Sequence, residues 1–109
     1  MKNLLKEESI DSLVKESKIL ILQFGTSTCA PCAAIKEKID IWSVDKKIVN
    51  SRYVSIEEYP EIAAEQGIFS APTVLVFVEG KLTIREAGYF SLEEIFMRIE
   101  RYSNILQND

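Results

Sequence analysis

Apolar and polar residues follow two different periods in the first part of this chain. Within residues 9–16, apolar side chains recur at the spacing of three and four residues that is typical of an amphipathic helix, at Ile10, Leu13 and Val14. Residues 18–24 form instead an almost continuous apolar run with one polar interruption. Such a run is typical of a central strand that is buried on both faces, usually in a parallel sheet. The pattern predicts a helix followed by a central strand.

The rest of the chain continues to alternate between helical and extended patterns. Further helices are expected over residues 30–41, 60–66 and from residue 91 onward, and further strands over residues 52–56, 73–78 and 81–86. Residues 43–50 are polar and indicate a loop. Residues 3–5 are compatible with a short edge strand. The last helix has a 3.6-residue apolar stripe, formed by Leu92, Ile95, Phe96, Ile99 and Tyr102.

Local signals support these boundaries. Pro31 suits the first turn of its helix, because the N–H that proline lacks would have no partner there. Glu79-Gly80 forms a tight turn between two strands and predicts a hairpin. Ser91 and Glu94 have the spacing of a capping box at the start of the last helix. The order of elements therefore predicts an α/β fold, with a mixed central β-sheet of four to five strands and helices on both faces.

Composition limits the class of protein. A length of 109 residues fits a single domain over residues 1–109, and 47% apolar residues are enough for one core. The net charge of −4 argues against a nucleic-acid partner, which needs a basic face. No apolar run approaches the roughly 18–20 residues that span a membrane, and the first residues lack the apolar stretch of a signal peptide. We therefore expect a cytoplasmic location and no membrane partner.

The chemistry of the chain is concentrated in Cys29 and Cys32, its only cysteines, which are separated by two residues. The first lies at the predicted start of a helix, where unsatisfied N–H groups and the helix dipole favour a thiolate. Cys32, one turn further, should be more enclosed. We predict that Cys29 attacks a substrate disulfide and that Cys32 resolves the mixed disulfide. Neither Ala30 nor Pro31 adds a charge, and the chain has no histidine, which favours a reducing role.

With these residues in view, the chain resembles the thioredoxin family from about residue 9 to residue 105. Five features carry the resemblance: the strand over residues 19–24, the motif Cys29-Ala30-Pro31-Cys32, the step Ala71-Pro72-Thr73 that opens a strand, the turn Glu79-Gly80, and Gly88 before the last helix. The resemblance implies a thioredoxin fold and the reduction of protein disulfides by dithiol–disulfide exchange.

The resemblance also implies a substrate surface and partners. Pro72 is expected to be cis and to lie against the cysteine pair, so that the backbone of Ala71 can pair with an extended substrate as an added strand. Gly88 is expected to line the same surface. The expected partners are disulfide-containing proteins and a reductase or a small thiol as electron donor. The protein is expected to act as a monomer, without a cofactor or a metal.

The surroundings of the motif depart from the thioredoxin pattern. Thr28 replaces a tryptophan, Ala33 replaces a basic residue, and Gln23 replaces a buried aspartate in the preceding strand. An amide can orient a water but cannot accept a proton as a base does, so we predict slower resolution by Cys32 than in a typical thioredoxin. The hydroxyl residues at positions 26–28 could contact the thiolate, but we expect them to cap the helix.

Two other functions remain compatible with the sequence. A thioredoxin-like module could bind partners, or sense oxidation, through a cysteine pair that does not turn over. A dimer could combine four thiolates around zinc or an iron–sulfur cluster, although one chain offers only two of the four usual ligands. The paired cysteines at a strand–helix junction, followed by Ala71-Pro72-Thr73, favour thiol–disulfide exchange over both.

Overall fold

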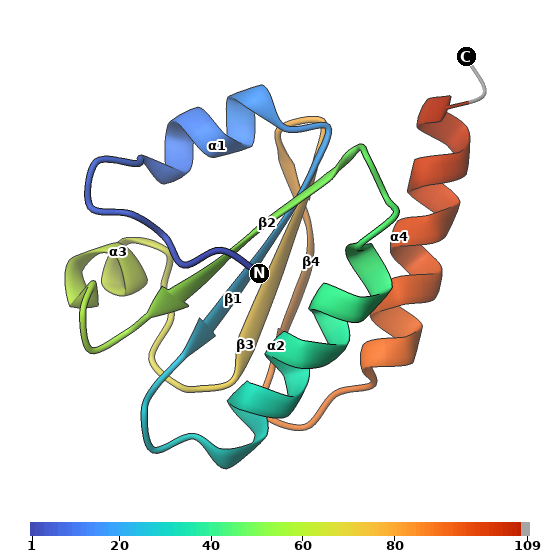
Figure 1. Cartoon of the computed structure of the whole chain (residues 1–109). Helices are drawn as coiled ribbons and strands as arrows, with labels where there is room; N and C mark the ends of the chain where they lie inside the picture. The colour runs from blue at the N-terminus through green and yellow to red at the C-terminus, as the bar shows by residue number, and fades with distance from the viewer. Residues whose placement is uncertain (108–109) are drawn as a thin grey trace.

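A computed structural model describes residues 1–107 of the chain (Figure 1). Its elements alternate in the predicted order: α1 (Ile10–Glu16), β1 (Ile19–Gly25), α2 (Ala30–Ser43), β2 (Val49–Ser55), α3 (Pro60–Glu65), β3 (Thr73–Val78), β4 (Lys81–Ala87) and α4 (Leu92–Gln107). Within these residues, no helix is both long enough and apolar enough to cross a membrane.

The four strands form one mixed sheet in the order β2-β1-β3-β4. β1 pairs in parallel with β2 and antiparallel with β3, and β3 and β4 form the predicted hairpin. Every residue of β1 is buried, as expected for a central strand. The expectation that the strand lies in a parallel sheet holds for only one of its two neighbours, because composition does not determine the direction of the neighbouring strand.

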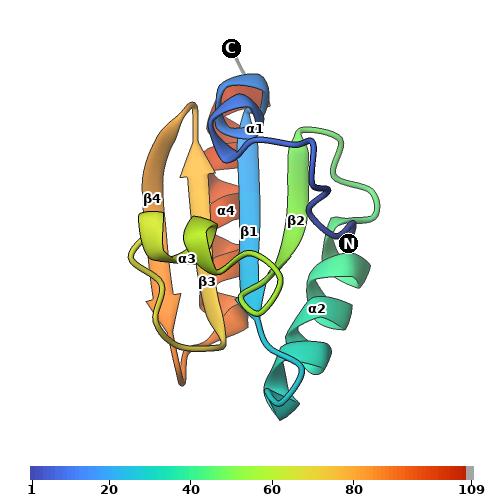
Figure 2. The ribbon, with the colours of Figure 1, turned by 90° about the vertical axis from the view of Figure 1, so that its left-hand side faces the viewer.

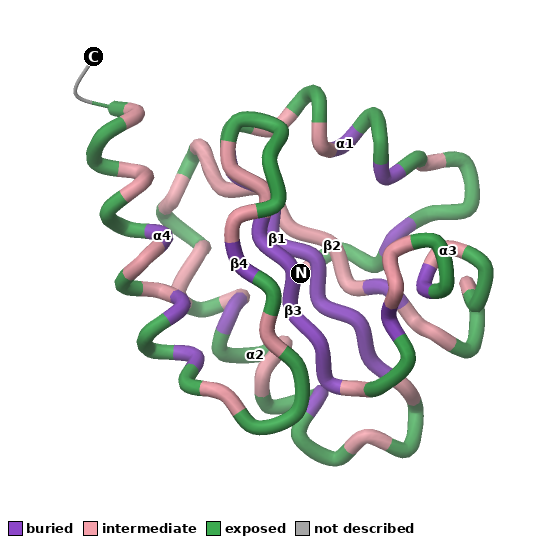
Figure 3. Tube along the Cα trace, turned by 180° about the vertical axis from the view of Figure 1, so that it is seen from behind, coloured by how far each residue is buried: buried purple, intermediate pink, exposed green. Residues whose placement is uncertain are grey.

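Helices cover both faces of the sheet, with α1 and α3 on one face and α2 and α4 on the other (Figure 2). Alternate side chains of β1 point to opposite faces, so the strand contributes to two separate cores. The core under α1 and α3 contains Leu20, Leu22 and Phe24. The core under α2 and α4 contains Ile19, Ile21, Ile39, Ile95 and Ile99. Figure 3 shows that β1 and much of β3 are buried between these helical layers.

The sequence pattern predicts a start for β2 that is three residues too late. The strand begins at Val49 rather than at residue 52, and Val49, Asn50 and Ser51 pair with the first three residues of β1. β2 lies near the edge of the sheet and most of its residues are only partly buried, so polar side chains are tolerated there. Residues 3–5 form a single parallel bridge from Asn3 to Tyr53 and not a strand.

Both predicted helix starts at serine are confirmed. Ser9 caps α1, and its hydroxyl accepts a hydrogen bond of 2.9 Å from the backbone N–H of Ser12. Ser91 accepts one of 3.2 Å from the backbone N–H of Glu94 at the start of α4. These caps satisfy N–H groups that have no partner within the helix.

Candidate active site

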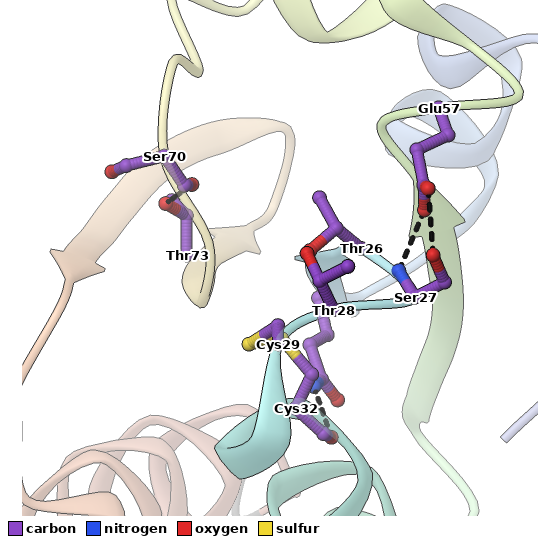
Figure 4. Close-up of a disulfide and its surroundings, with 9 residues drawn as sticks. Thr26, Ser27, Thr28, Cys29, Cys32, Glu57, Ser70 and Thr73 are labelled. Atoms are coloured by element: carbon purple, nitrogen blue, oxygen red, sulfur yellow. Dashed lines mark hydrogen bonds between the residues drawn. A yellow bond between two sulfur atoms is a disulfide. The ribbon is translucent and has the colours of Figure 1, made fainter.

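The cysteine pair lies where β1 ends and α2 begins, at one end of the sheet. Cys29 and Cys32 form a disulfide with their Cα atoms 5.4 Å apart (Figure 4). Cys29 is the N-cap of α2, and Pro31 lies in the first turn as predicted. The backbone N–H of Cys32 donates to the carbonyl of Cys29 at 3.2 Å. The fold therefore holds both sulfurs on one helical turn, close enough to open and close a bond.

The two cysteines differ in exposure, as the sequence predicts. Cys29 is partly exposed, whereas Cys32 has only 1% of its surface exposed. Cys29 also lies at the N-terminus of a 14-residue helix, where the positive end of the helix dipole favours negative charge on its sulfur after reduction. Cys29 is therefore the more accessible residue of the pair, and Cys32 is enclosed.

Gln23 lies on β1 beside the second cysteine and is completely buried. Its side-chain nitrogen Nε2 donates a hydrogen bond of 2.8 Å to the carbonyl oxygen of Cys32. The oxygen of the same side-chain amide, Oε1, is buried and has no hydrogen-bond partner among residues 1–107. The residue that replaces the family's acid therefore anchors the backbone of Cys32.

The expectation that hydroxyl residues cap α2 was wrong. The helix begins after Cys29, so Thr26, Ser27 and Thr28 all precede the N-cap, and the cap itself makes no side-chain hydrogen bond. Thr26 and Thr28 instead have their hydroxyl oxygens 3.4 Å apart. Ser27 turns toward the loop after β2 (Figure 4).

Glu57, in that loop, forms two hydrogen bonds with Ser27. Its carboxylate accepts a hydrogen bond of 2.6 Å from the backbone N–H of Ser27 and one of 2.7 Å from the Ser27 hydroxyl. These two bonds, the side-chain bond first, lower the pKa of Glu57. Glu57 follows a strand in a polar loop and lies 30 residues from Ser27 in the chain, so no sequence pattern indicates its contact with the segment before Cys29.

The strand ends place the predicted substrate residues at the same end of the sheet as the cysteines. Phe24, near the end of β1, pairs with Thr73, and Thr73 pairs with Ala87. The peptide bond between Ala71 and Pro72 is cis, and the carbonyl of Pro72 accepts a hydrogen bond of 3.0 Å from Gly88. Figure 4 shows the loop through Ser70 and Thr73 across from Cys29.

A groove of about 290 Å³ adjoins the start of α2. Pro31 and Ile35 line it on the helix side, and Gly88, Tyr89 and Phe90 line it on the other. Tyr89 is fully exposed, and Phe69, just before the cis bond, has 86% of its surface exposed. Tyr89 therefore leaves an aromatic side chain uncovered at the groove, as is typical of a surface that contacts a partner.

Tyr53, on β2, is a residue near the site whose importance the sequence did not reveal. An ideal Cβ placed on Gly25 would overlap the Tyr53 hydroxyl and lie 3.0 Å from the Sγ of Cys32. Gly25 therefore leaves the space in which these two groups approach each other. The sequence signal that could have indicated this close approach is a glycine at the end of a buried strand, shortly before the two cysteines.

Metal ligands do not gather in the part of the chain that the structure describes: no three histidine, cysteine, aspartate or glutamate side chains form a cluster there.

Comparison with known proteins agrees with this geometry. The family model described as Thioredoxin matches residues 2–101. The thioredoxin of Mycoplasmoides gallisepticum is 27% identical over 95 residues, which are 87% of this chain and 95% of that protein. The M-type chloroplast thioredoxin of Chlamydomonas reinhardtii is 30% identical over 100 residues, which are 90% of this chain and 71% of that protein.

Solved structures share the fold. The chain matches a Plasmodium falciparum thioredoxin with a TM-score of 0.79 and 21% identity, over 90% of this chain and 98% of that one. Thioredoxin 1 of Thermosipho africanus matches with a TM-score of 0.73 and 27% identity, over 81% and 98%. The chain therefore belongs to the thioredoxin family and is a thiol–disulfide oxidoreductase with a Cys29–Cys32 pair.

Proposed function

We propose that the protein reduces disulfide bonds in other proteins. In the reduced enzyme, the Cys29 thiolate attacks one sulfur of a substrate disulfide, and the other substrate sulfur leaves as a thiolate that takes up a proton. Cys32 then loses its proton and attacks Cys29. This attack forms the Cys29–Cys32 bond and releases the second substrate sulfur. The observation that carries the proposal is the contrast between an accessible Cys29 and an enclosed Cys32.

The substrate is proposed to bind as an extended segment along Ala71, Pro72 and Gly88. The backbone N–H and C=O of Ala71 form no hydrogen bond to any of residues 1–107, whereas the Pro72 carbonyl is already bonded to Gly88. A substrate segment can pair with Ala71 as an added strand, and the apolar groove beside Gly88 can receive a side chain. Its sulfur then lies near Cys29.

The same exchange chemistry indicates how an electron donor restores the reduced enzyme. The oxidised pair must be reduced after each turnover, by a reductase or a small thiol that attacks the accessible Cys29. We propose that one chain suffices for the cycle, since both cysteines and the proposed substrate backbone belong to it. The cytoplasmic location expected from the sequence stays a prediction.

Insulin reduction with dithiothreitol tests the proposal. Wild-type protein should accelerate the precipitation of the insulin B chain, and Cys29→Ser should abolish the acceleration. Cys32→Ser should stop turnover and accumulate a mixed disulfide with Cys29, which mass spectrometry detects. A wild-type protein without activity would contradict reduction and favour the binding or redox-sensing module.

A further inference from the structure

Tyr53 and Cys32 approach each other on the face of the sheet that α2 covers. Tyr53 pairs with Gln23 across the parallel strands β2 and β1, and Gly25 lies two residues further along β1. Because side chains alternate between the two faces of a sheet, these three positions lie on the same face. Gln23 on this face is bonded to the Cys32 carbonyl. The topology therefore brings a phenol from a neighbouring strand toward the resolving cysteine.

The distances limit how far apart the two groups can be. Tyr53 Cζ and Cys32 Sγ lie 2.8 and 3.0 Å from the same point, the ideal Cβ position of Gly25. They can be no farther apart than the sum of these distances, and the hydroxyl oxygen is nearer to that point than Cζ is. The hydroxyl is thus within reach of the sulfur directly or through one water.

The Tyr53 hydroxyl is available for such a contact. It makes no hydrogen bond with any group of residues 1–107, in contrast to Tyr59, whose hydroxyl donates to the Leu4 carbonyl at 3.1 Å. The Nζ of Lys36 lies 4.6 Å from the centre of the Tyr53 ring and holds it from the α2 side. Partial burial of the ring favours a partner for its polar tip.

We propose that the Tyr53 hydroxyl donates a hydrogen bond to the Cys32 thiolate, directly or through one water, and so stabilises the sulfur that resolves the mixed disulfide. A hydrogen bond to the charged form of a group favours that form. Tyr53 thereby replaces, by a different means, the help that an acid at position 23 gives in typical thioredoxins. This inference rests on the proposed function.

The step balances without a further reactant. Cys32 gives its proton to solvent, and its thiolate supplies the electron pair of the new bond to Cys29. The bond between Cys29 and the substrate sulfur breaks, and that sulfur leaves with the pair and takes up a proton. The two enzyme sulfurs are oxidised and the substrate is reduced, while Tyr53 stays protonated.

The charged groups around Tyr53 are consistent with a neutral donor. Burial and then the Glu57 carboxylate raise the pKa of Tyr53, so the phenol keeps its proton at neutral pH. Lys36 approaches the face of the ring from α2. Gln23, which faces from β1, does not titrate.

Titration of Cys32 alone tests the inference without any substrate. Cys29→Ser leaves one thiol, and the ¹³Cβ chemical shift of labelled Cys32 reports the pH midpoint of thiolate formation. Adding Tyr53→Phe, which removes only the hydroxyl, should raise the midpoint by about one unit or more. Adding Tyr102→Phe, the same change on α4, should leave it in place. An unmoved midpoint in the Tyr53 variant, or an equal shift in both, would overturn the inference.

A second measurement covers the case in which Tyr53→Phe does not fold. Replacing all four tyrosines by 3-fluorotyrosine keeps every hydroxyl and makes it a stronger donor. The Cys32 midpoint in Cys29→Ser should then fall, and an unchanged midpoint would contradict the inference. Neither measurement depends on turnover. A wild-type protein that is inactive toward insulin would therefore contradict the proposed function without changing the outcome of either titration of Cys32.

Discussion

Gln23 and Cys32, nine residues apart in the chain, are joined by a hydrogen bond of 2.8 Å from the side-chain amide to the main-chain carbonyl. The bond links the centre of the sheet to the first turn of α2. It uses the donor end of the amide and leaves the acceptor end, Oε1, buried without a partner among residues 1–107. Gln23 therefore places a polar group next to Cys32 that holds its backbone but takes no proton.

Gln23→Asp should speed the resolution step, by about tenfold or more, because a carboxylate can accept the Cys32 proton. The same change removes the donor to the Cys32 carbonyl and should lower the free energy of unfolding by about 1–3 kcal/mol. Stopped-flow decay of a mixed disulfide and urea unfolding measure the two effects. Gln23→Asn, whose amide is also unable to titrate, serves as control. An unchanged resolution rate in the aspartate variant would show that position 23 does not limit the step.

Glu57→Gln should destabilise the protein at neutral pH and have a smaller effect in acid. Because the bonds from Ser27 lower the pKa of Glu57 in the folded state, its contribution to stability is complete above the unfolded pKa of about 4.3. The contribution is lost as the pH falls through the lowered folded pKa. Urea unfolding at pH 7, 4 and 3 should therefore show a difference between wild type and variant that shrinks toward the lowest pH.

The matched control for this change is Glu65→Gln, at the exposed end of α3. It removes the same charge without a bond to Ser27, so it separates the effect of overall charge from that of the contact. Equal pH dependence in the two variants would mean that overall charge, and not the contact with Ser27, causes the effect.

Arg52→Lys should lower the free energy of unfolding by about 1 kcal/mol. Arg52 reaches Glu8 with two nitrogens at 2.9 to 3.2 Å, and both side chains are mostly shielded from solvent. A lysine has one charged nitrogen and cannot form this forked contact. Chemical denaturation compares the variant with Arg101→Lys on the exposed surface of α4, which should have no measurable effect.

Two isoleucines in α2 provide a test of the packing. Ile39 is completely buried in the core under α2 and α4, whereas 67% of the surface of Ile41 is exposed. Ile39→Ala should lower the free energy of unfolding by about 2–5 kcal/mol, and Ile41→Ala should change it by no more than about 0.5 kcal/mol. Thermal or urea unfolding measures both. Similar losses would contradict the placement of the helix on the sheet.

Most of the fold could be predicted because its signals are local. Seven buried residues of β1 are almost all apolar, and α4 starts at a serine cap and carries one apolar stripe. The direction of β1 relative to β3 and the start of β2 at Val49 could not be predicted in the same way. Strand direction depends on how distant segments meet, and a strand with one partly open face can contain polar residues that also occur in loops.

The residues of the site also fall into two groups, those that a local sequence signal predicts and those that only the pairing of distant segments brings together. Cys29 and Cys32 were identified because they are rare and chemically distinctive, and Pro31 marked the start of their helix. The contacts of Ser27 with Glu57, and the approach of Tyr53, depend on the pairing of β1 with β2 and on the loop that follows. A glutamate in a polar loop and a tyrosine in a strand are common, so neither attracts attention until the sheet brings it to the cysteines.

The space beside Gly25 also limits the order in which this site can change by mutation. Any larger residue at position 25 meets the Tyr53 hydroxyl first and then the sulfur of Cys32. A chain that replaces Gly25 while it still has Tyr53 must therefore pass through a crowded intermediate, whereas a chain that first replaces Tyr53 by a smaller residue relieves the tighter of the two contacts. The effect of a substitution at either position depends on the residue at the other, so the two sites are expected to change together, with Tyr53 first.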